Sequence, residues 1–588
     1  MSGSQRRVSP ASRDSSDPTP ASPAHANRFT ALATPAHYLS LAIAFALLLY
    51  FARVTWFKGD EFGFFARMQP GQSVNLLTPY YEQWSTVPLM ITQVLYTWVG
   101  LHSILPYSVW MLLAHVTLAH ILWRWMRRIG ADPWVATALT AVFLMVRGGV
   151  LDATEEFWYW QQVTFTMSLI FGFLGVLLID HDGPSDHRDV AFWLLAILSL
   201  MSSDVGVFMV VVGGLVALLR RGPVEALRVV CIPTLVFLAW LVLIAHGAPS
   251  ATPTPRQDLP LLLQYVWTGI TQAVIGATGW GDASIVLLVV LAAWMYRERR
   301  LARGPQALAF AAAAVVPLFF FGTGVARVAL GSVEAASARF GYVCIALLLP
   351  ASALALSRIS LRSPGLGRGL VVAASGAWIL NGLAGLEILV QAFTPFMTTT
   401  MRATTLGAAQ LVATGAPLAV GETDALPYGP SVELLRSMLR SGAFPTLLPV
   451  SRADRLDAAA YFQVSLTSTG LIAAGVPPAV LPAYQTVVRD DGGGCISPIS
   501  PTGQPEVGLS FASPASVELI SDASGSSTFQ IAWASSPTAL TAVQSLPLPE
   551  GDVYFNVTAA GTIALLTLPA ATYRLCGVTM ASTTAPAP

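Results

Sequence analysis

The sequence predicts a mainly α-helical polytopic membrane bundle of about eleven transmembrane helices, followed by an extracytoplasmic domain with a β-sandwich-like fold. Hydrophobic residues make up 54% of the 588 residues and charged residues only 11%, which argues against an ordinary soluble protein. Long apolar segments recur between residues 38 and 393. Beyond them, short runs of β-forming residues alternate with Gly, Pro and Ser, as in a small all-β domain.

Composition divides the chain into three parts. Residues 1–36 are rich in Ser, Pro and Ala and are predicted to be a disordered cytosolic tail. Residues 37–393 form the expected membrane domain, and residues 394–588 form the expected extracytoplasmic domain. The formal net charge is zero and no basic tract is present, which argues against nucleic acid as a partner.

Arginines mark one side of the expected bundle. A spanning helix needs roughly 20 apolar residues, and loops on the cytosolic side collect Lys and Arg. Arginine clusters follow every second apolar segment, which predicts a cytosolic N-terminus and an extracytoplasmic C-terminus. The expected spans are residues 38–56, 105–123, 134–150, 163–179, 190–201, 205–219, 227–246, 285–296, 308–321, 340–356 and 370–393.

Three segments need a separate interpretation. Residues 87–100 and 261–280 are apolar but would reverse the arginine pattern if they crossed, so we expect them to lie in the extracytoplasmic interface. A single helix over residues 190–219 would be about 45 Å long, more than a hydrocarbon core of roughly 30 Å. We therefore expect Ser202, Ser203 and Asp204 to form a turn between two short helices.

An acidic pair follows the first expected span. Asp60 and Glu61 lie beside Lys58, which is the only lysine in the chain. Carboxylates at the edge of a bilayer are costly to hold there. In a partly dry cleft a carboxylate is a good general base, because desolvation raises its affinity for a proton. The alternative is that Asp60 and Glu61 only cap an interfacial helix and pair with Lys58.

A second polar segment lies between the third and fourth expected spans. It contains Glu155, Glu156, Trp158 and Gln161, which we interpret as candidate substrate-binding residues. Aromatic faces can stack on sugar rings, and carboxylates and amides can bind hydroxyls. The alternative is an aromatic belt, since Trp and Tyr also gather at membrane interfaces.

The C-terminal part is predicted to contain one helix and a small β-sandwich. The helix is expected at residues 431–441 and the strands at residues 516–520, 528–534, 553–557, 563–568 and 573–578. Cys495 and Cys576 could form a disulfide that staples the two ends of the domain, if it lies outside the cytosol. Such modules bind sugars in some proteins and are only structural in most. No Cys/His cluster in the chain has the spacing of a metal site.

The order of these features resembles the GT-C superfamily of polyprenyl-phosphate-sugar-dependent glycosyltransferases. These have a first span, an acidic pair outside, an interfacial helix, and then a helix that ends in clustered arginines. Residues 82–89, Glu-Gln-Trp-Ser-Thr-Val-Pro-Leu, are similar to a loop of bacterial members in which His-Trp precedes an interfacial helix. Here Gln83 replaces the usual His. Ala338-Arg339-Phe340 is similar to their Ser-Arg-Tyr at the start of a late span.

The resemblance covers residues 38–393. It implies an enzyme of the bacterial plasma membrane that transfers a sugar, with inversion, from a polyprenyl-phosphate donor to a glycan, lipid or protein acceptor outside. Asp60 would be the catalytic base, Glu61 would support it, and Arg339 would contact the lipid phosphate. A leaving phosphate needs a cation or a divalent metal nearby, and Lys58 is a further candidate.

Two other classes of function fit the same composition. A transporter or flippase for a lipid or glycan would have broken helices and charges near the bilayer midplane. In this sequence the charges gather at the ends of the spans instead. A non-catalytic envelope protein would use its membrane part only to display the C-terminal domain.

Overall fold

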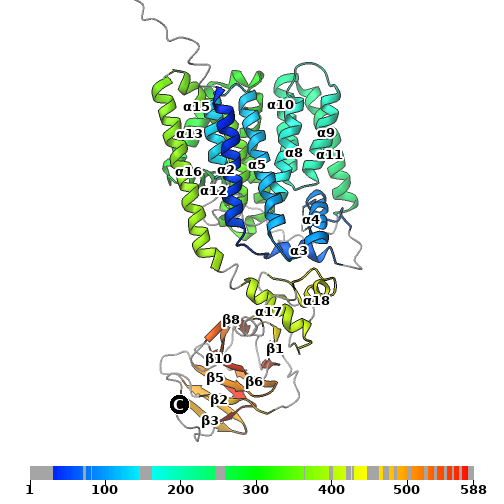
Figure 1. Ribbon diagram of the computed structural model, residues 1–588, viewed down its shortest axis with the longest axis vertical. Coiled ribbons are helices and arrows are strands. Elements are labelled where there is room, and N and C mark those ends of the chain that lie inside the picture. The colour runs from blue at the N-terminus through cyan, green and yellow to red at the C-terminus, as the bar shows by residue number, and fades with distance from the viewer. Residues whose placement is uncertain are drawn as a thin grey trace, which may run out of the picture.

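The computed structural model of the chain contains a helical bundle, a short helical segment and a β-sandwich, stacked in that order along the long axis (Figure 1). The structure describes residues 31–69, 75–80, 83–145, 162–245, 259–362, 364–395, 401–416, 418, 421, 425–426, 429–445, 458, 462–467, 476–481, 487–499, 505–521, 527–534, 540–548, 553–558, 562–568 and 573–580. Residues 1–30 of the expected tail lie outside these ranges, and residues 31–36 already belong to the first helical segment.

Each segment that was expected to span coincides with a helix. The helices are α2 (Ala33–Ala52), α5 (Leu105–Arg128), α6 (Pro133–Leu144), α8 (Val163–Ile179), α9 (His187–Leu200), α10 (Val205–Arg221), α11 (Pro223–Leu243), α13 (Ala283–Arg297), α14 (Ala307–Arg327), α15 (Ala338–Arg362) and α16 (Pro364–Pro395). By length and composition, α2, α5, α11, α14 and α15 can cross a membrane. The number of eleven crossings stays a prediction.

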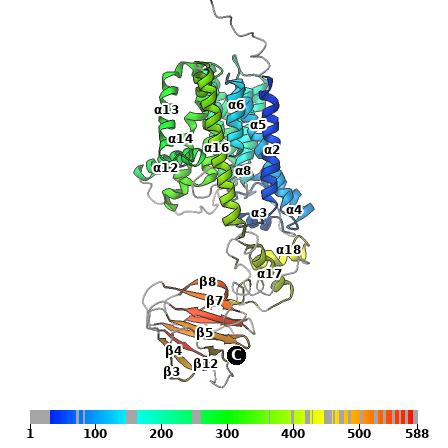
Figure 2. The ribbon, with the colours of Figure 1, turned by 60° about the vertical axis from the view of Figure 1, so that its left-hand side comes forward.

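The segment at residues 261–280 forms α12 (Leu259–Thr278), which is bent by 110° against α13. Figure 2 shows α12 lying across the bundle while α13 runs along it. The two helices could count as one broken span, which would raise the number of candidate spans to six. The bend is also the geometry expected of an interfacial helix that leads into a span.

One end of the bundle, here called the arginine end, holds the loops at residues 129–132, 180–186 and 298–306. Arg128 on α5 and Arg220 on α10 both form ion pairs with Asp180, with an Nε–Oδ2 distance of 3.0 Å for Arg128. Arg221 forms a two-pronged pair with Asp189 at 2.6 and 3.1 Å. Arginine clusters that are far apart in the sequence therefore meet at one end, as their pattern predicts.

The opposite end, here called the α3 end, holds α3 (Asp60–Ala66), α4 (Thr86–Val99) and the turn between α9 and α10. That turn falls at residues 201–204, where the sequence predicts it. The Val87 amide donates to the Met201 carbonyl at 3.1 Å, so α4 packs against the turn. Trp98, on the outward side of α4, is 82% exposed, as expected for a helix in a membrane interface.

Beyond the bundle, α17 (Arg402–Ala413) and α18 (Val432–Arg440) lead to the β-sandwich at the α3 end (Figure 1). α18 coincides with the expected helix, whose start is capped by the Ser431 hydroxyl. The Leu101 amide donates to the Ala443 carbonyl at 2.8 Å, and the Arg402 guanidinium lies 4.9 Å from the ring centre of Trp56. The C-terminal part thus packs directly on the α3 end.

Within the described residues, the sandwich consists of two six-stranded sheets, with strand orders β1-β9-β6-β11-β4-β3 and β12-β2-β5-β10-β7-β8. The five expected strands coincide with β6, β7, β9, β10 and β11. The disulfide between Cys495 and Cys576 is present, but it joins the neighbouring strands β4 and β11 rather than the two ends of the domain. The strands are β1 (Val464–Thr467), β2 (Ala479–Leu481), β3 (Val487–Gly492), β4 (Cys495–Ile499), β5 (Glu506–Phe511), β6 (Ala515–Ser521), β7 (Ser527–Ala534), β8 (Leu540–Leu548), β9 (Val553–Val557), β10 (Thr562–Thr567), β11 (Tyr573–Cys576) and β12 (Thr579–Met580).

Candidate functional site

The acidic pair begins α3. Gly59 has φ 52° and ψ −125°, a conformation that glycine adopts readily. It allows the chain to turn sharply into α3. Glu61 is fully buried, and its carboxylate accepts the Lys58 amide at 2.8 Å. Glu61 therefore contacts Lys58, as the alternative interpretation expected, but through the Lys58 main-chain amide, and this bond holds the turn that leads into the N-cap Gly59. Asp60, in the same turn, is half-buried.

Tyr80 connects α3 to the following loop. Its hydroxyl donates to the Asp60 carbonyl at 2.6 Å, and its ring lies 4.5 Å from that of Phe64. The main chain of Tyr80 pairs with that of Gln83 through two hydrogen bonds of 2.9 and 3.0 Å. A side chain at Gly63 would collide with the Tyr80 hydroxyl, so this approach requires glycine. Tyr80 is thereby held against α3 and beside Gln83.

Trp84 anchors the same loop to the bundle. Its ring stacks on Trp240 of α11 with centroids 4.9 Å apart and planes inclined by 3°. The Trp240 indole donates to the Leu77 carbonyl at 2.8 Å. On the other side, Arg67 donates to the carbonyls of Thr78 and Pro79. Gln83 therefore has a defined position beside the helices.

Gln83 lines a cavity of about 180 Å³ at the α3 end. Asp204 at the start of α10 and Arg327 at the end of α14 contribute a carboxylate and a guanidinium to the same lining. The Ser203 hydroxyl donates to the Asp204 carboxylate at 2.9 Å. The remaining lining residues are Phe165, Val205, Val207, Phe208, Phe319, Gly322, Thr323, Ala326 and Phe340.

Arg327 and Arg339 share one acidic partner. Arg327 lies 3.4 Å and Arg339 2.6 Å from the Glu334 carboxylate, and all three side chains are between 21 and 23% exposed. Both guanidinium groups also approach the ring of Phe340, at 5.9 and 5.2 Å from its centre. The trio itself contains two guanidinium groups and one carboxylate, and it lies beside a cavity with aromatic walls.

The predicted site residues are only partly brought together. Lys58, Asp60 and Glu61 lie on or next to α3, and Arg339 lies at the α3 end beside Arg327. Glu155, Glu156, Trp158 and Gln161 lie outside the described residues, as does Glu82. Gln162, which directly follows them, is the N-cap of α8, the helix that contributes Phe165 to the cavity. None of the predicted catalytic or substrate-binding residues is among the described lining residues.

Asp204, Arg327 and Glu334 converge here, although they are not among the predicted site residues. The arginine pattern puts all three on the same side of the bundle, because each is a charged residue at the end of an apolar helix or in the short segment after it. No spacing rule connects positions so far apart along the chain, so the sequence did not predict that they would meet at one cavity.

A group of possible metal ligands lies at the opposite end. Atoms of His181, Asp186 and Asp189 lie within 4.8 Å of one another. Arg221 already donates two hydrogen bonds to Asp189, and its positive charge opposes a cation there. Within the described ranges, this group is therefore better explained as part of the ion-pair network.

A search of solved structures finds similarity to the crystal structure of ArnT from Cupriavidus metallidurans bound to undecaprenyl phosphate. The identity is 14% and the TM-score 0.44, over 68% of this chain and 84% of that chain. No protein-family model and no curated protein matches the chain. Because the identity and the TM-score are low, we base no inference on this similarity.

Proposed function

We propose that this protein transfers a sugar from a polyprenyl-phosphate-linked donor to an envelope acceptor. It would do so as a multi-pass protein of a bacterial plasma membrane, with the α3 end on the extracytoplasmic side. The observation that carries the proposal is the cavity at the α3 end. It combines a carboxylate, an amide and a guanidinium with aromatic walls, at the end of helices that are long and apolar enough to cross a membrane.

The reaction would be a single displacement. The hydroxyl oxygen of the acceptor attacks the anomeric carbon, the bond from that carbon to the phosphate oxygen breaks, and the configuration is inverted. The acceptor proton passes to a carboxylate, and polyprenyl phosphate leaves with the bonding electron pair. Fixed cations stabilise the negative charge that develops on the leaving phosphate. Arg327 lines the cavity, and Arg339 shares its partner Glu334.

We propose Asp60 as the general base and Glu61 as the residue that positions it. Asp60 is half-buried, and the Tyr80–Gln83 pairing connects its turn to the cavity. Asp204 is the second candidate, because its carboxylate lines the cavity directly. Lys58 could add a cation, and Glu155, Glu156, Trp158 and Gln161 remain proposed contacts to the sugar or the acceptor. A divalent metal is compatible with this chemistry but is not required by it.

The test is a transfer assay with the full-length protein in proteoliposomes, labelled polyprenyl-phosphate sugars as donors and envelope extract as acceptor. Loss of a general base lowers the rate by roughly 10²–10⁴-fold, so Asp60→Asn should lose transfer to that extent. Arg327→Gln should also lower it, because the leaving phosphate loses a cation. Asp282→Asn is the matched control, since Asp282 is exposed in the α12–α13 turn and its side chain caps nothing.

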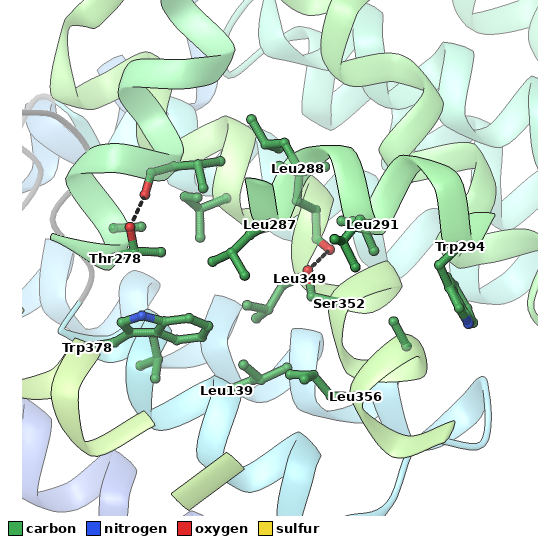
Figure 3. Close-up of a pocket in the computed structure, with 17 residues that line it drawn as sticks. Leu139, Thr278, Leu287, Leu288, Leu291, Trp294, Leu349, Ser352, Leu356 and Trp378 are labelled. Atoms are coloured by element: carbon green, nitrogen blue, oxygen red, sulfur yellow. Dashed lines mark hydrogen bonds between the residues drawn. The ribbon is translucent and has the colours of Figure 1, made fainter. Parts of the chain in front are cut away.

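The assay also distinguishes between Asp60 and Asp204 as the general base. Full transfer by Asp60→Asn together with loss in Asp204→Asn would move the role of base to Asp204. If the wild type transfers no sugar from any donor, the proposal of sugar transfer is wrong. The transporter alternative is less well supported, because the mid-bundle cavity shown in Figure 3 is lined by apolar residues except Thr278 and Ser352.

A further inference from the structure

The mid-bundle cavity has a volume of about 260 Å³. Its two hydroxyl groups are already used: Thr278 donates to the Val274 carbonyl at 2.8 Å and Ser352 to the Leu348 carbonyl at 3.1 Å, as the dashed lines in Figure 3 show. The Trp378 indole N–H is a buried donor without a partner among the described residues. A buried water usually needs two to four polar partners, so this one donor does not favour water in the cavity. The lining residues are Leu139, Val142, Val274, Ala277, Thr278, Leu287, Leu288, Val290, Leu291, Trp294, Ile345, Leu348, Leu349, Ser352, Ala355, Leu356 and Trp378.

One wall of this cavity is a loosely packed helix. In α13 only Ser284 is buried. Leu287, Leu291 and Trp294 face the cavity, whereas Val289, on another face of α13, is 60% exposed. The cavity therefore lies midway along the bundle but near its side, with α13 as its outer wall.

The Trp294 end of the cavity leads to exposed arginines. Figure 3 shows Trp294 on the opposite side of the cavity from Thr278 and Trp378. Arg297 follows Trp294 by one turn of α13, and Arg358 follows the lining residue Leu356 on α15. Arg299, Arg300 and Arg303 lie in the 3-10 turn that comes directly after α13. The side chains of these five arginines are exposed.

These arginines differ from most of the others at the same end of the bundle. Arg124 and Arg127 also form no ion pair within the described residues, but they lie on α5, which contributes no residue to the cavity lining. Arg128, Arg188, Arg220, Arg221 and Arg228 each form an ion pair with an aspartate or a glutamate. Within the described part of the chain, no ion pair is formed by Arg297, Arg299, Arg300, Arg303 or Arg358. Glu298 is the acidic residue of this stretch and also forms none there. A positive cluster without acidic partners thus lies beside an apolar cavity.

We propose that the cavity and the arginine cluster bind one anionic phospholipid of the surrounding membrane. One acyl chain would occupy the space between α13 and α15, and the phosphate would contact Arg297 and Arg358. Basic groups beside an apolar space between membrane helices are typical of such lipid sites. The proposal depends on the bundle lying in a membrane and not on sugar transfer.

The position of the charge favours a bilayer phospholipid over the polyprenyl-phosphate carrier. The cluster lies at the arginine end, whereas the proposed transfer cavity with Arg327 lies at the α3 end. A carrier phosphate held at Arg297 would be at the wrong end of the bundle to react.

The test is native mass spectrometry of the full-length chain released from nanodiscs of equal parts phosphatidylglycerol and phosphatidylcholine. The wild type should retain one phosphatidylglycerol. Arg297→Gln/Arg358→Gln should lower the retained ratio of phosphatidylglycerol to phosphatidylcholine by roughly thirtyfold, if each arginine contributes as basic residues near a membrane surface do. Arg124→Gln/Arg127→Gln is the charge control, because these arginines are exposed on α5 at the same end and should leave the ratio unchanged.

A second pair of variants tests the cavity itself. Leu291→Trp fills it and should abolish retention of either lipid, whereas Val289→Trp on the exposed face of α13 should not. An unchanged lipid ratio in the arginine variant would overturn the proposal, as would full retention in Leu291→Trp. Retention of added polyprenyl phosphate in place of phosphatidylglycerol would assign the cavity to the carrier instead. The arginine variant alters only exposed side chains, so it tests the site even if Leu291→Trp does not fold.

Discussion

Gly63 and Gly100 are residues at the α3 end where neighbouring atoms occupy the space of a side chain. At Gly63 that neighbour is the Tyr80 hydroxyl, and at Gly100 it is the main chain of Ala443. The first contact fixes the loop that leads to Gln83, and the second fixes the C-terminal segment on the bundle. The close approach of neighbouring atoms therefore explains why both positions need glycine. At Gly100 the φ of 57° is a second reason.

Gly100→Ala is expected to weaken the docking of the C-terminal segment. The new methyl group would lie 2.5 Å from the Ala443 carbonyl oxygen, and the positive φ adds strain. We expect the clash and the backbone strain together to reduce the stability of this docking by roughly 2–4 kcal/mol. Faster hydrogen exchange over residues 432–443 should report it.

Gly130→Ala is the matched control. Gly130 also has a positive φ, of 86°, but its missing side chain would meet nothing within 4 Å. Gly130→Ala should reduce the stability of the protein by only about 1–2 kcal/mol. It should leave hydrogen exchange at residues 432–443 unchanged. Equal exchange in the two variants would show that the contact with Ala443 does not hold the segment.

At the scale of elements, paired charges join the ends of helices at the arginine end. Arg221 on α10 and Asp189 in the first turn of α9 are each 2% exposed, and Asp189 also completes the capping box of α9. Arg228 and Glu225, on α11, form a more exposed pair within one helix. The Arg221–Asp189 pair connects two helices and is shielded from water, so it should stabilise the bundle far more than the Arg228–Glu225 pair.

Arg221→Gln should destabilise the bundle by about 3–5 kcal/mol, because it leaves the buried Asp189 carboxylate without its charge partner. Arg228→Gln should cost at most about 1 kcal/mol, since exposed pairs contribute little. Thermal unfolding in detergent compares the two variants. Similar losses in both would contradict the assignment of a buried, connecting pair.

The Arg221–Asp189 pair also predicts that the stability of the bundle depends on pH. Burial opposes ionisation of Asp189, but hydrogen bonds from Arg221 and the Asp186 amide hold its pKa below the usual value. A group with a lowered pKa stabilises the fold above its unfolded pKa, which is about 4 for an aspartate. Stability should therefore decline as the pH falls below that value, and less so in Arg221→Gln.

At the scale of the whole molecule, the α3 end of the bundle and the C-terminal domain lie on the same side (Figure 1). Contacts of Leu101 with Ala443 and of Trp56 with Arg402 join them. Any membrane orientation must therefore put both outside or both inside. The arginine pattern favours outside, and a disulfide in the sandwich is typical of an oxidising compartment.

Lys58 offers a test of this orientation without substitution. It is the only lysine and is half-buried beside α3. A membrane-impermeant amine reagent applied to intact cells that express the chain should label Lys58, as detected by mass spectrometry of its peptide. Labelling that occurs only after permeabilisation would put α3 in the cytosol and refute the orientation. A reagent that crosses membranes is the control for access to Lys58.

Much of the fold could be predicted because it depends on local properties. Apolar segments predicted the long helices of the bundle, with boundaries that differ by up to six residues, and Ser202 to Asp204 marked the turn before α10. The short helix α3 was not predicted in this way. Alternation identified β6 and β9. By contrast, β1 to β5, β8 and β12 were not predicted. In β3 and β4, Arg489, Asp490 and Pro498 interrupt the pattern. Their pairing with each other and with β11 outweighs their weak local propensity.

The sequence by itself determined the helical segments, the side on which arginines gather, the turn at residues 202–204 and the cysteine pair, since each depends on hydrophobicity, charge or spacing along the chain. Only the tertiary structure decided that Gln83, Asp204 and Arg327 line one cavity. It also decided that the arginines after α13 remain without acidic partners among the described residues. The reason is that helix packing brings together positions more than a hundred residues apart, and no periodicity in the chain records which of them will meet.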